Sequence, residues 1–265
     1  MIKRVLIIGA SDCSGGAGIQ ADIKSITALG GYAATAITAV TIQNTTGVFS
    51  IINIDPKDVI EQIKVTINDI GVDIIKIGML HKLQLIEAIA EFLDLYCKEI
   101  PIVVDPVMIS QSKVRLLEKK AIKSLVDHIL PLATIITPNI PEAEVLSKTK
   151  ILNKLDMICA IKKISHLSMN FTLLKGGHLK EKNIIDILSN KNKILKIFEK
   201  KVIISDNTHG TGCSLASAIA ISLAQGMNIE DSIIRARDFV RKAIKTAPNY
   251  GKGNGPLNHS HYDTK

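Results

Sequence analysis

A short turn in the last third of the chain combines the residue types that phosphate chemistry needs. Its sequence, Asn-Thr-His-Gly-Thr-Gly-Cys, ends at Cys213 and lies between a strand-like run at 202–204 and a helix-like segment at 214–218. Gly210 and Gly212 let the backbone approach a ligand closely, and the free N–H groups and dipole of a following helix favour an anion. A thiol on the first turn of that helix would lie beside the bound group. The turn therefore predicts a phosphoryl-transfer site.

The elements that must position this turn alternate between short apolar strands and helical patterns. We expect strands at 5–9, 33–40, 74–77, 102–104, 134–136 and 171–174, with antiparallel edge strands within 184–204. We expect helices at 18–29, 55–70, 82–97, 118–130, 154–168, 212–225 and 229–246. This alternation predicts an α/β fold with a mostly parallel sheet covered by helices on both faces. Because no linker or composition break is visible, residues 1–265 are expected to form a single domain.

The composition argues against several other classes of protein. Lys and Arg outnumber Asp and Glu by 33 to 25, which gives a net charge of +8 and a pI near 9.2. The lysines are nevertheless spread along the chain and only 3% of residues are aromatic, so no nucleic-acid partner is expected. The four cysteines form no CxxC pair, and no apolar run is long enough to span a bilayer. We expect a cytoplasmic protein with reduced thiols and no membrane role.

The segments that follow the predicted strands, where ligands bind in a parallel sheet, carry a specific resemblance. It rests on seven blocks, in order: 14–22, 38–45, 76–80, 105–108, 137–143, 174–178 and 208–213. Together they resemble the hydroxymethylpyrimidine/phosphomethylpyrimidine kinases of thiamine biosynthesis, in the ribokinase-like superfamily. The resemblance implies a three-layer α/β/α ribokinase-like fold and a homodimer. It also implies ATP with Mg²⁺, used to phosphorylate a hydroxymethylpyrimidine and then its monophosphate.

The acceptor side of the predicted site is formed by the earlier blocks. The primary amide of Gln43 offers a donor and an acceptor side by side, complementary to an aminopyrimidine, although a solvated loop glutamine is the alternative. Asp22 would accept from the same amino group or hold a neighbouring loop. Met79 would contact the face of the ring or belong to the core. The resemblance adds Gly9 and Val107 to the substrate-binding residues.

The nucleotide side is formed by later blocks. Asn139 and Glu142 resemble family positions that contact phosphate and metal, although Glu142 could instead be a first-turn helix residue. Asp105 follows a fully apolar strand, so a Mg²⁺ or phosphate-proximal role is favoured over a buried salt bridge. The resemblance also assigns Thr208 and Thr211 to nucleotide binding.

The transferred group would meet Lys175 and Cys213. Lys175 follows a strand and precedes two glycines, and its ammonium suits the phosphoryl group. A thiol of pKa about 8.5 becomes more acidic at a helix N-terminus, so Cys213 could take the proton of the acceptor hydroxyl. Packing against the turn is its alternative role. Gly210 and Gly212 would leave backbone N–H groups free for the phosphoryl oxygens.

Other readings of the sequence stay open. A pyridoxal or pyridoxamine kinase of the same superfamily is the nearest, and a non-catalytic nucleotide-binding protein and a cysteine hydrolase using Cys213 with His209 are more distant. Capping its loop and contacting phosphate are the alternative roles of His209. His259 and His261 are spaced like a metal pair, but with no third ligand nearby a solvated tail is expected. The glycines of 251–255 would form a loop near the nucleotide, as the resemblance implies.

Overall fold

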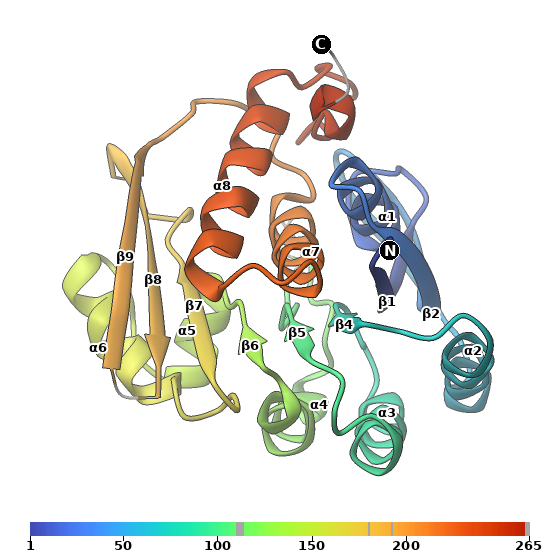
Figure 1. Ribbon diagram of the computed structural model, residues 1–265. Coiled ribbons are helices and arrows are strands. Elements are labelled where there is room, and N and C mark those ends of the chain that lie inside the picture. Colours follow the sequence, from blue (N-terminus) through green and yellow to red (C-terminus); the bar gives the residue numbers. More distant parts are fainter. Residues whose placement is uncertain (110–113, 180, 192, 263–265) are drawn as a thin grey trace.

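The computed structural model describes residues 1–265 except 110–113, 180, 192 and 263–265 (Figure 1). The strands are β1 (Arg4–Asp12), β2 (Tyr32–Asn44), β3 (Gly47–Asn53), β4 (Ile74–Ile77), β5 (Ile102–Val104), β6 (Ile135–Ile136), β7 (Phe171–Lys175), β8 (Asn183–Asn190) and β9 (Lys193–Lys201). The helices are α1 (Gly18–Ala28), α2 (Pro56–Asp69), α3 (Leu83–Tyr96), α4 (Lys119–Ser124), α5 (Ile140–Ser147), α6 (Lys154–Ile164), α7 (Thr211–Ala224) and α8 (Ile229–Lys245). Short helical turns occupy Leu125–Ile129, Leu130–Leu132 and His259–Tyr262.

These strands form one sheet in the order β3-β2-β1-β4-β5-β6-β7-β8-β9. The strands from β2 to β7 in that order are parallel to their neighbours. β3 pairs antiparallel with β2 at one end of the sheet, and β8 and β9 continue antiparallel from β7 at the other. The carboxyl ends of the parallel strands therefore meet at one edge, where the loops that follow them can share a ligand.

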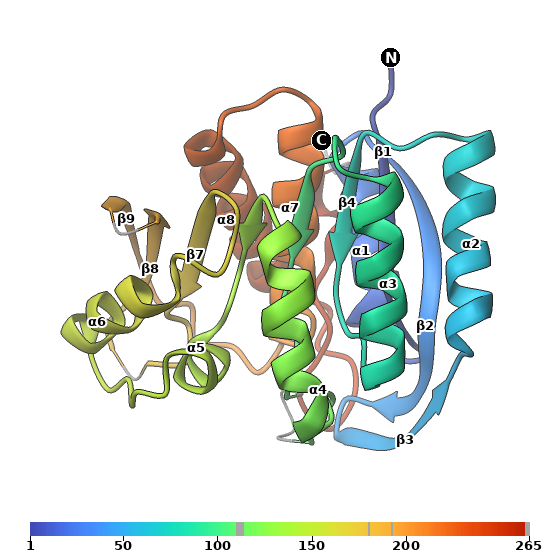
Figure 2. The same cartoon turned by 90° about the horizontal axis from the view of Figure 1, so that it is seen from below.

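Helices cover both faces of the sheet because successive side chains of each strand point to opposite faces (Figure 2). In β1, Leu6 and Ile8 pack toward α2, α3 and α4, whereas Val5 and Ile7 pack toward α1, α7 and α8. Leu174 of β7 packs with α5 and α6. The predicted three-layer α/β/α fold is confirmed. Within the described residues, none of these helices combines the length and the apolar character needed to cross a membrane.

Several expected elements differ from those observed. Residues 202–204 are not a strand: β9 ends at Lys201, which pairs with the first residue of β8, and Ile204 is 98% exposed. The helix expected at 118–130 ends as α4 at Ser124 and continues as short non-α turns, because Pro131 has no N–H and clashes with the preceding turn. β3 was not expected, and α5 was expected only as the alternative role of Glu142. The prediction missed β3 because its hairpin turn contains no Asn-Gly or Asp-Gly signal.

The C-terminal histidines are not part of a solvated tail, and that prediction is wrong. His259 is 5% exposed and His261 is 6% exposed. Both rings pack near Phe239 of α8, and the backbone N–H of Asn258 donates to the carbonyl of Ala243 at 3.0 Å. The tail turns back onto α8 because these rings and Leu257 bury apolar surface there.

One lysine lies fully inside the layer between the sheet and α1. Lys76, in the middle of β4, is 1% exposed and its Nζ is 2.8 Å from Oδ2 of Asp22 in α1. The hydroxyl of Ser217 in α7 donates to the other carboxylate oxygen at 2.7 Å. A single carboxylate thus ties α1, β4 and α7 together beneath the carboxyl edge of the sheet.

We predict that Lys76→Met destabilises the protein by about 3–5 kcal/mol, because it leaves the buried Asp22 without its counter-charge. The measurement is the free energy of unfolding in urea. The double variant Lys76→Met/Asp22→Asn should recover most of the loss, since neither charge then remains. Lys64→Met removes an exposed pair with Glu61 and is the control, expected to be silent. A Lys76→Met protein as stable as the control would contradict the prediction.

Candidate active site

Two glycine-rich loops meet where α7 begins. Gly210 is the N-cap of α7 with φ of +84°, and a Cβ there would collide with the carbonyl oxygen of Gly16 in the loop after β1. A side chain on Gly16 would in turn collide with the ring of His209. Gly210 thus lies directly against the backbone of the first loop and Gly16 against the His209 ring, so neither position has room for a side chain.

The α7 turn passes over a buried ion pair. A Cβ on Gly212 would lie 3.4 Å from Oδ2 of Asp105 and 3.4 Å from Nζ of Lys175. The same Nζ is 2.7 Å from Oδ1 of Asp105, which also accepts a hydrogen bond of 3.0 Å from the hydroxyl of Thr137. The structure thus contains the buried salt bridge that the sequence analysis disfavours for Asp105. It forms because β5 and β7 flank the short β6 and direct these side chains over its end.

Asn139 and Glu142 are joined to each other at the start of α5. The backbone N–H of Glu142 donates to the amide oxygen of Asn139 at 3.0 Å, and Glu142 accepts from the N–H of Asn139 at 2.8 Å. This capping box is the first-turn role that the sequence left as an alternative for Glu142. Burial raises the pKa of Glu142 to about 8, with Lys175 opposing the rise and Asp105 adding to it. The carboxyl group is thus largely protonated at neutral pH.

Cys213 lies between the two buried ion pairs on the first turn of α7. Burial raises the pKa of its thiol to about 12; the charge of Lys76 lowers it, while Asp22 and Asp105 raise it further. The expectation that the helix N-terminus makes this thiol more acidic is therefore wrong for the free protein. Removal from water and two nearby carboxylates outweigh the helix dipole.

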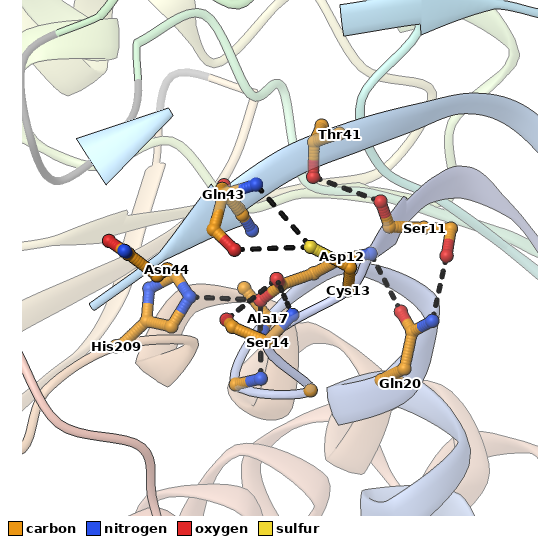
Figure 3. A network of polar contacts seen from close by, with 12 residues as sticks. Ser11, Asp12, Cys13, Ser14, Ala17, Gln20, Thr41, Gln43, Asn44 and His209 are labelled. Atoms are coloured by element: carbon orange, nitrogen blue, oxygen red, sulfur yellow. Dashed lines mark hydrogen bonds and ion pairs between the residues drawn. The ribbon is translucent and has the colours of Figure 1, made fainter. Parts of the chain in front are cut away.

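Asp12, at the end of β1, organises the loop that follows it (Figure 3). Its carboxylate accepts from the N–H groups of Ser14, Gly16 and Ala17 at 2.8, 3.2 and 2.7 Å. Nε2 of His209 lies 2.9 Å from Oδ2 of Asp12. Burial opposes ionisation, but the hydrogen bonds of His209, Ser14 and Gln43 hold the pKa of Asp12 well below its usual range.

Sequence reasoning missed Asp12. The available signal was a carboxylate at the end of an apolar strand, followed by a glycine-rich loop whose free N–H groups need an acceptor. The same network shows that His209 contacts Asp12 and through it the loop after β1, a role that the sequence did not predict. Its contact with phosphate stays a prediction.

Gln43 lies beside the same network, near the end of β2 (Figure 3). Its side chain hydrogen-bonds with Asp12, and its backbone oxygen accepts from the thiol of Cys13 at 3.1 Å. The first glycine loop is therefore fastened to the strand that carries the predicted substrate-reading residue. Cys13 makes this bridge, although the sequence analysis gives it no role.

The remaining acceptor-side residues lie at the same end of the sheet but are mostly buried. Met79 is 7% exposed and packs with Ala10, Ala39 and Leu116, and Val107 packs against this cluster. Gly9 is also buried and its missing Cβ would meet only ordinary contacts. Asp22 is committed to Lys76 and Ser217, so it holds neighbouring elements together. Contact of these four residues with a substrate stays a prediction.

A pocket of about 460 Å³ opens beside the α7 turn. Its walls are the chain from Ile204 to Asn207 and the loop from Asn249 to Gly253. Thr208 follows the first wall directly, and its carbonyl accepts from the N–H of Thr211 at 3.3 Å. The glycines at 251 and 253 therefore line a pocket close to Thr208. Binding of a nucleotide there, and contact with Thr208 and Thr211, stay predictions.

The described residues contain no group of three His, Cys, Asp or Glu side chains arranged as a metal site. Asp105 and Glu142 nevertheless supply two buried carboxyl groups, close enough for each to affect the ionisation of the other. Mg²⁺ usually takes only one or two protein carboxylates and completes its coordination with phosphate oxygens and water. The donor set fits a Mg²⁺ ion that arrives with a nucleotide.

A buried lysine beneath the free N–H groups of a helix terminus, at the carboxyl edge of a parallel sheet, suits phosphoryl transfer to a small molecule. The protein falls among the kinases of ribokinase-like fold. A family model described as phosphomethylpyrimidine kinase matches residues 12–258, and the chain belongs to this family. The resemblance found in the sequence and the prediction of a kinase are confirmed.

Individual relatives agree with this assignment. A thiamine biosynthesis bifunctional protein of Geobacter sulfurreducens is 42% identical over 96% of this chain, which spans only 52% of that longer protein. The hydroxymethylpyrimidine/phosphomethylpyrimidine kinase of Haemophilus influenzae is 36% identical, over 98% of both chains. Among solved structures, an ADP complex of Bacillus subtilis pyridoxal kinase superposes with a TM-score of 0.90 at 32% identity, over the full length of both chains.

We predict that Glu142 makes the free protein less stable as the pH rises. Its pKa is about 8 in the folded state against an ordinary value of 4.5, so the folded state binds its proton more tightly. This contribution is complete below the ordinary value and is lost as the pH rises through about 8. Glu142→Gln stays neutral while keeping the acceptor for the N–H of Asn139, so it should lack this slope.

The measurement is the free energy of unfolding in urea between about pH 5 and 9. The stability difference between wild type and Glu142→Gln should shift in favour of the variant as the pH increases. Glu91→Gln, at an exposed position on α3, is the matched control. Parallel pH curves for wild type and Glu142→Gln would rule out the raised pKa.

Proposed function

We propose that this protein transfers the γ-phosphoryl group of ATP to the hydroxyl of a hydroxymethylpyrimidine and then to the resulting monophosphate. The observation that carries the proposal is the position of Lys175 and Asp105 directly beneath Gly212 of the α7 turn. A phosphoryl group at this turn would meet an ammonium group and free backbone N–H groups together. These are the parts that a loose, charge-spreading transition state requires.

In the proposed complex, the nucleotide occupies the pocket between 204–207 and 249–253 and extends its phosphates toward the α7 turn. The ammonium group of Lys175 contacts the transferred phosphoryl group, and the N–H groups of Gly212 and Cys213 donate to the phosphoryl oxygens. Asn139, Glu142 and Asp105 hold Mg²⁺, whose charge would offset that of the phosphates. Gln43 reads the aminopyrimidine, with Met79, Val107 and Gly9 along its ring.

Cys213 is proposed to receive the proton of the acceptor hydroxyl. With a pKa of about 12 in the free protein, its thiol is protonated at neutral pH. The thiol must therefore first release this proton to solvent, and the thiolate then takes the proton of the acceptor hydroxyl. Lys76 favours that thiolate electrostatically. A thiolate of such a high pKa is a strong base, and the proton of the acceptor hydroxyl has to be removed only as the new O–P bond develops. The second acceptor is already an anion and needs no strong base.

We predict that Cys213→Ala slows the first phosphorylation by about 10²-fold and the second by much less. Single-turnover assays of each step, with the pyrimidine and with its monophosphate, measure this. The rate of the first step in wild type should also rise between about pH 7 and 9, because the thiolate fraction grows, and Cys213→Ala should lose this rise. Cys213→Ser keeps the volume of the side chain and separates packing from proton transfer. Equal losses in both steps would contradict the base role.

A pyridoxal kinase is the second candidate, favoured by the close structural likeness to the Bacillus subtilis enzyme. We predict that ADP release is fastest with hydroxymethylpyrimidine and its monophosphate and slower with pyridoxal. A coupled assay with these three acceptors, each compared by kcat/KM, measures the preference. A higher kcat/KM for pyridoxal would reverse the assignment of the main substrate while leaving the kinase reaction in place.

A homodimer, a cytoplasmic location and a single domain over 1–265 belong to the same proposal. They are supported by the resemblance of the chain to its family and by one continuous sheet whose strands, with the segments that follow them, carry the proposed site residues. The free oligomeric state can be measured by light scattering of the purified protein.

A further inference from the structure

The C-terminal segment holds the α7 turn at both ends. Before the turn, the backbone N–H of His209 donates to the carbonyl of Gly255 at 3.1 Å. After the turn, Nε2 of His259 lies 2.8 Å from the hydroxyl oxygen of Ser214. Residues 255–259 therefore bracket Gly210 to Cys213, the part of the chain proposed to contact the phosphoryl group.

This external support matters because the turn has little rigidity of its own. Gly210 and Gly212 have no side chains to pack, and glycine has the largest backbone freedom. Within the turn, the N–H of Thr211 bonds to the carbonyl of Thr208 and the N–H of Ser214 bonds to that of Gly210. The side chain of Ser214 is the first polar group after the reactive stretch, and it is fully buried against His259.

The histidine is itself firmly anchored. The N–H of Asn258 bonds to Ala243, and Nε2 of His261 lies 2.9 Å from the carbonyl oxygen of Phe239, so the segment is fixed to α8 on both sides of His259. Burial lowers the pKa of His259 to about 4, and the charges of Lys24 and His261 lower it further. The imidazole is therefore neutral at physiological pH, and its bond with Ser214 joins two neutral groups out of contact with water.

We infer that His259 is a positioning residue for phosphoryl transfer: through Ser214 it fixes the first turn of α7, and with it the alignment of Gly212 and Cys213. The inference rests on the proposed role of that turn. Because His259 is 5% exposed, bonds to Ser214 and does not line the proposed nucleotide pocket, its loss should lower kcat while leaving both KM values nearly unchanged.

The test compares His259→Ala with His261→Ala, which removes a similarly buried ring from the same segment but one that bonds to α8. We expect kcat to fall about tenfold for His259→Ala, equivalent to the alignment given by one hydrogen bond, and to change little for His261→Ala. His259→Gln, which can still offer a polar group to Ser214, should recover part of kcat. Urea unfolding shows whether the two alanine variants lose similar stability.

A second measurement follows the turn itself, independently of activity. Amide hydrogen exchange of a peptide covering residues 211–217 should accelerate in His259→Ala and in Ser214→Ala, but not in His261→Ala. The double variant Ser214→Ala/His259→Ala should lose no more kcat than either single variant, because both remove the same contact.

Unchanged exchange in His259→Ala, or additive losses of kcat in the double variant, would overturn the inference by showing that the contact between His259 and Ser214 does not fix the turn. Faster exchange with an unchanged kcat would also overturn the inference, because it would show that the α7 turn can become more flexible without affecting phosphoryl transfer. A failure of the pyrimidine as substrate would instead appear in the wild-type acceptor panel, so the two failures can be told apart.

Discussion

The site depends on keeping charged groups out of water at the end of a sheet. Lys76 with Asp22 and Lys175 with Asp105 are two ion pairs whose members are at most 9% exposed. Removing such groups from water costs several kcal/mol each, and only close, hydrogen-bonded geometry repays it. Thr137 and Ser217 supply the additional hydrogen bonds. Because the four charged residues lie in α1, in β4, directly after β5 and in β7, α1 and these three strands must be in place before the pairs can form.

The same desolvation sets the chemistry of the uncharged groups between the pairs. Cys213 and Glu142 have no counter-charge of their own, so burial favours their protonated forms. In the free site both groups therefore hold their protons, and a cation bound nearby would lower the pKa of each and favour proton release. A helix N-terminus alone would predict an acidic thiol, and here the low dielectric and the neighbouring carboxylates dominate.

The sequence predicts this architecture well and its contacts poorly. The parallel sheet, the α7 turn and Lys175 are visible because strand periodicity and glycine spacing are local signals. The pairing of Lys175 with Asp105, 70 residues earlier in the chain, depends on which strands become neighbours, and no local pattern encodes that. His259 was misjudged for the same reason, because its partner Ser214 lies 45 residues away. Asp12 had a local signal in the glycine loop that follows it, and only its contact with His209, 197 residues away, had none.

The balance of charge supports the proposal that the nucleotide binds together with a cation. With Glu142 protonated, the two ammonium groups of the ion pairs meet two carboxylates, and the interior of the site is close to neutral. Lys175 cannot compensate a polyphosphate fully, because Asp105 already shares its charge. An approaching phosphate would therefore meet a partly compensated ammonium and two carboxyl groups, which disfavours it unless a divalent ion accompanies it. In the proposed complex such an ion would also favour ionisation of Glu142, so nucleotide binding and proton release would be coupled through that one carboxyl group.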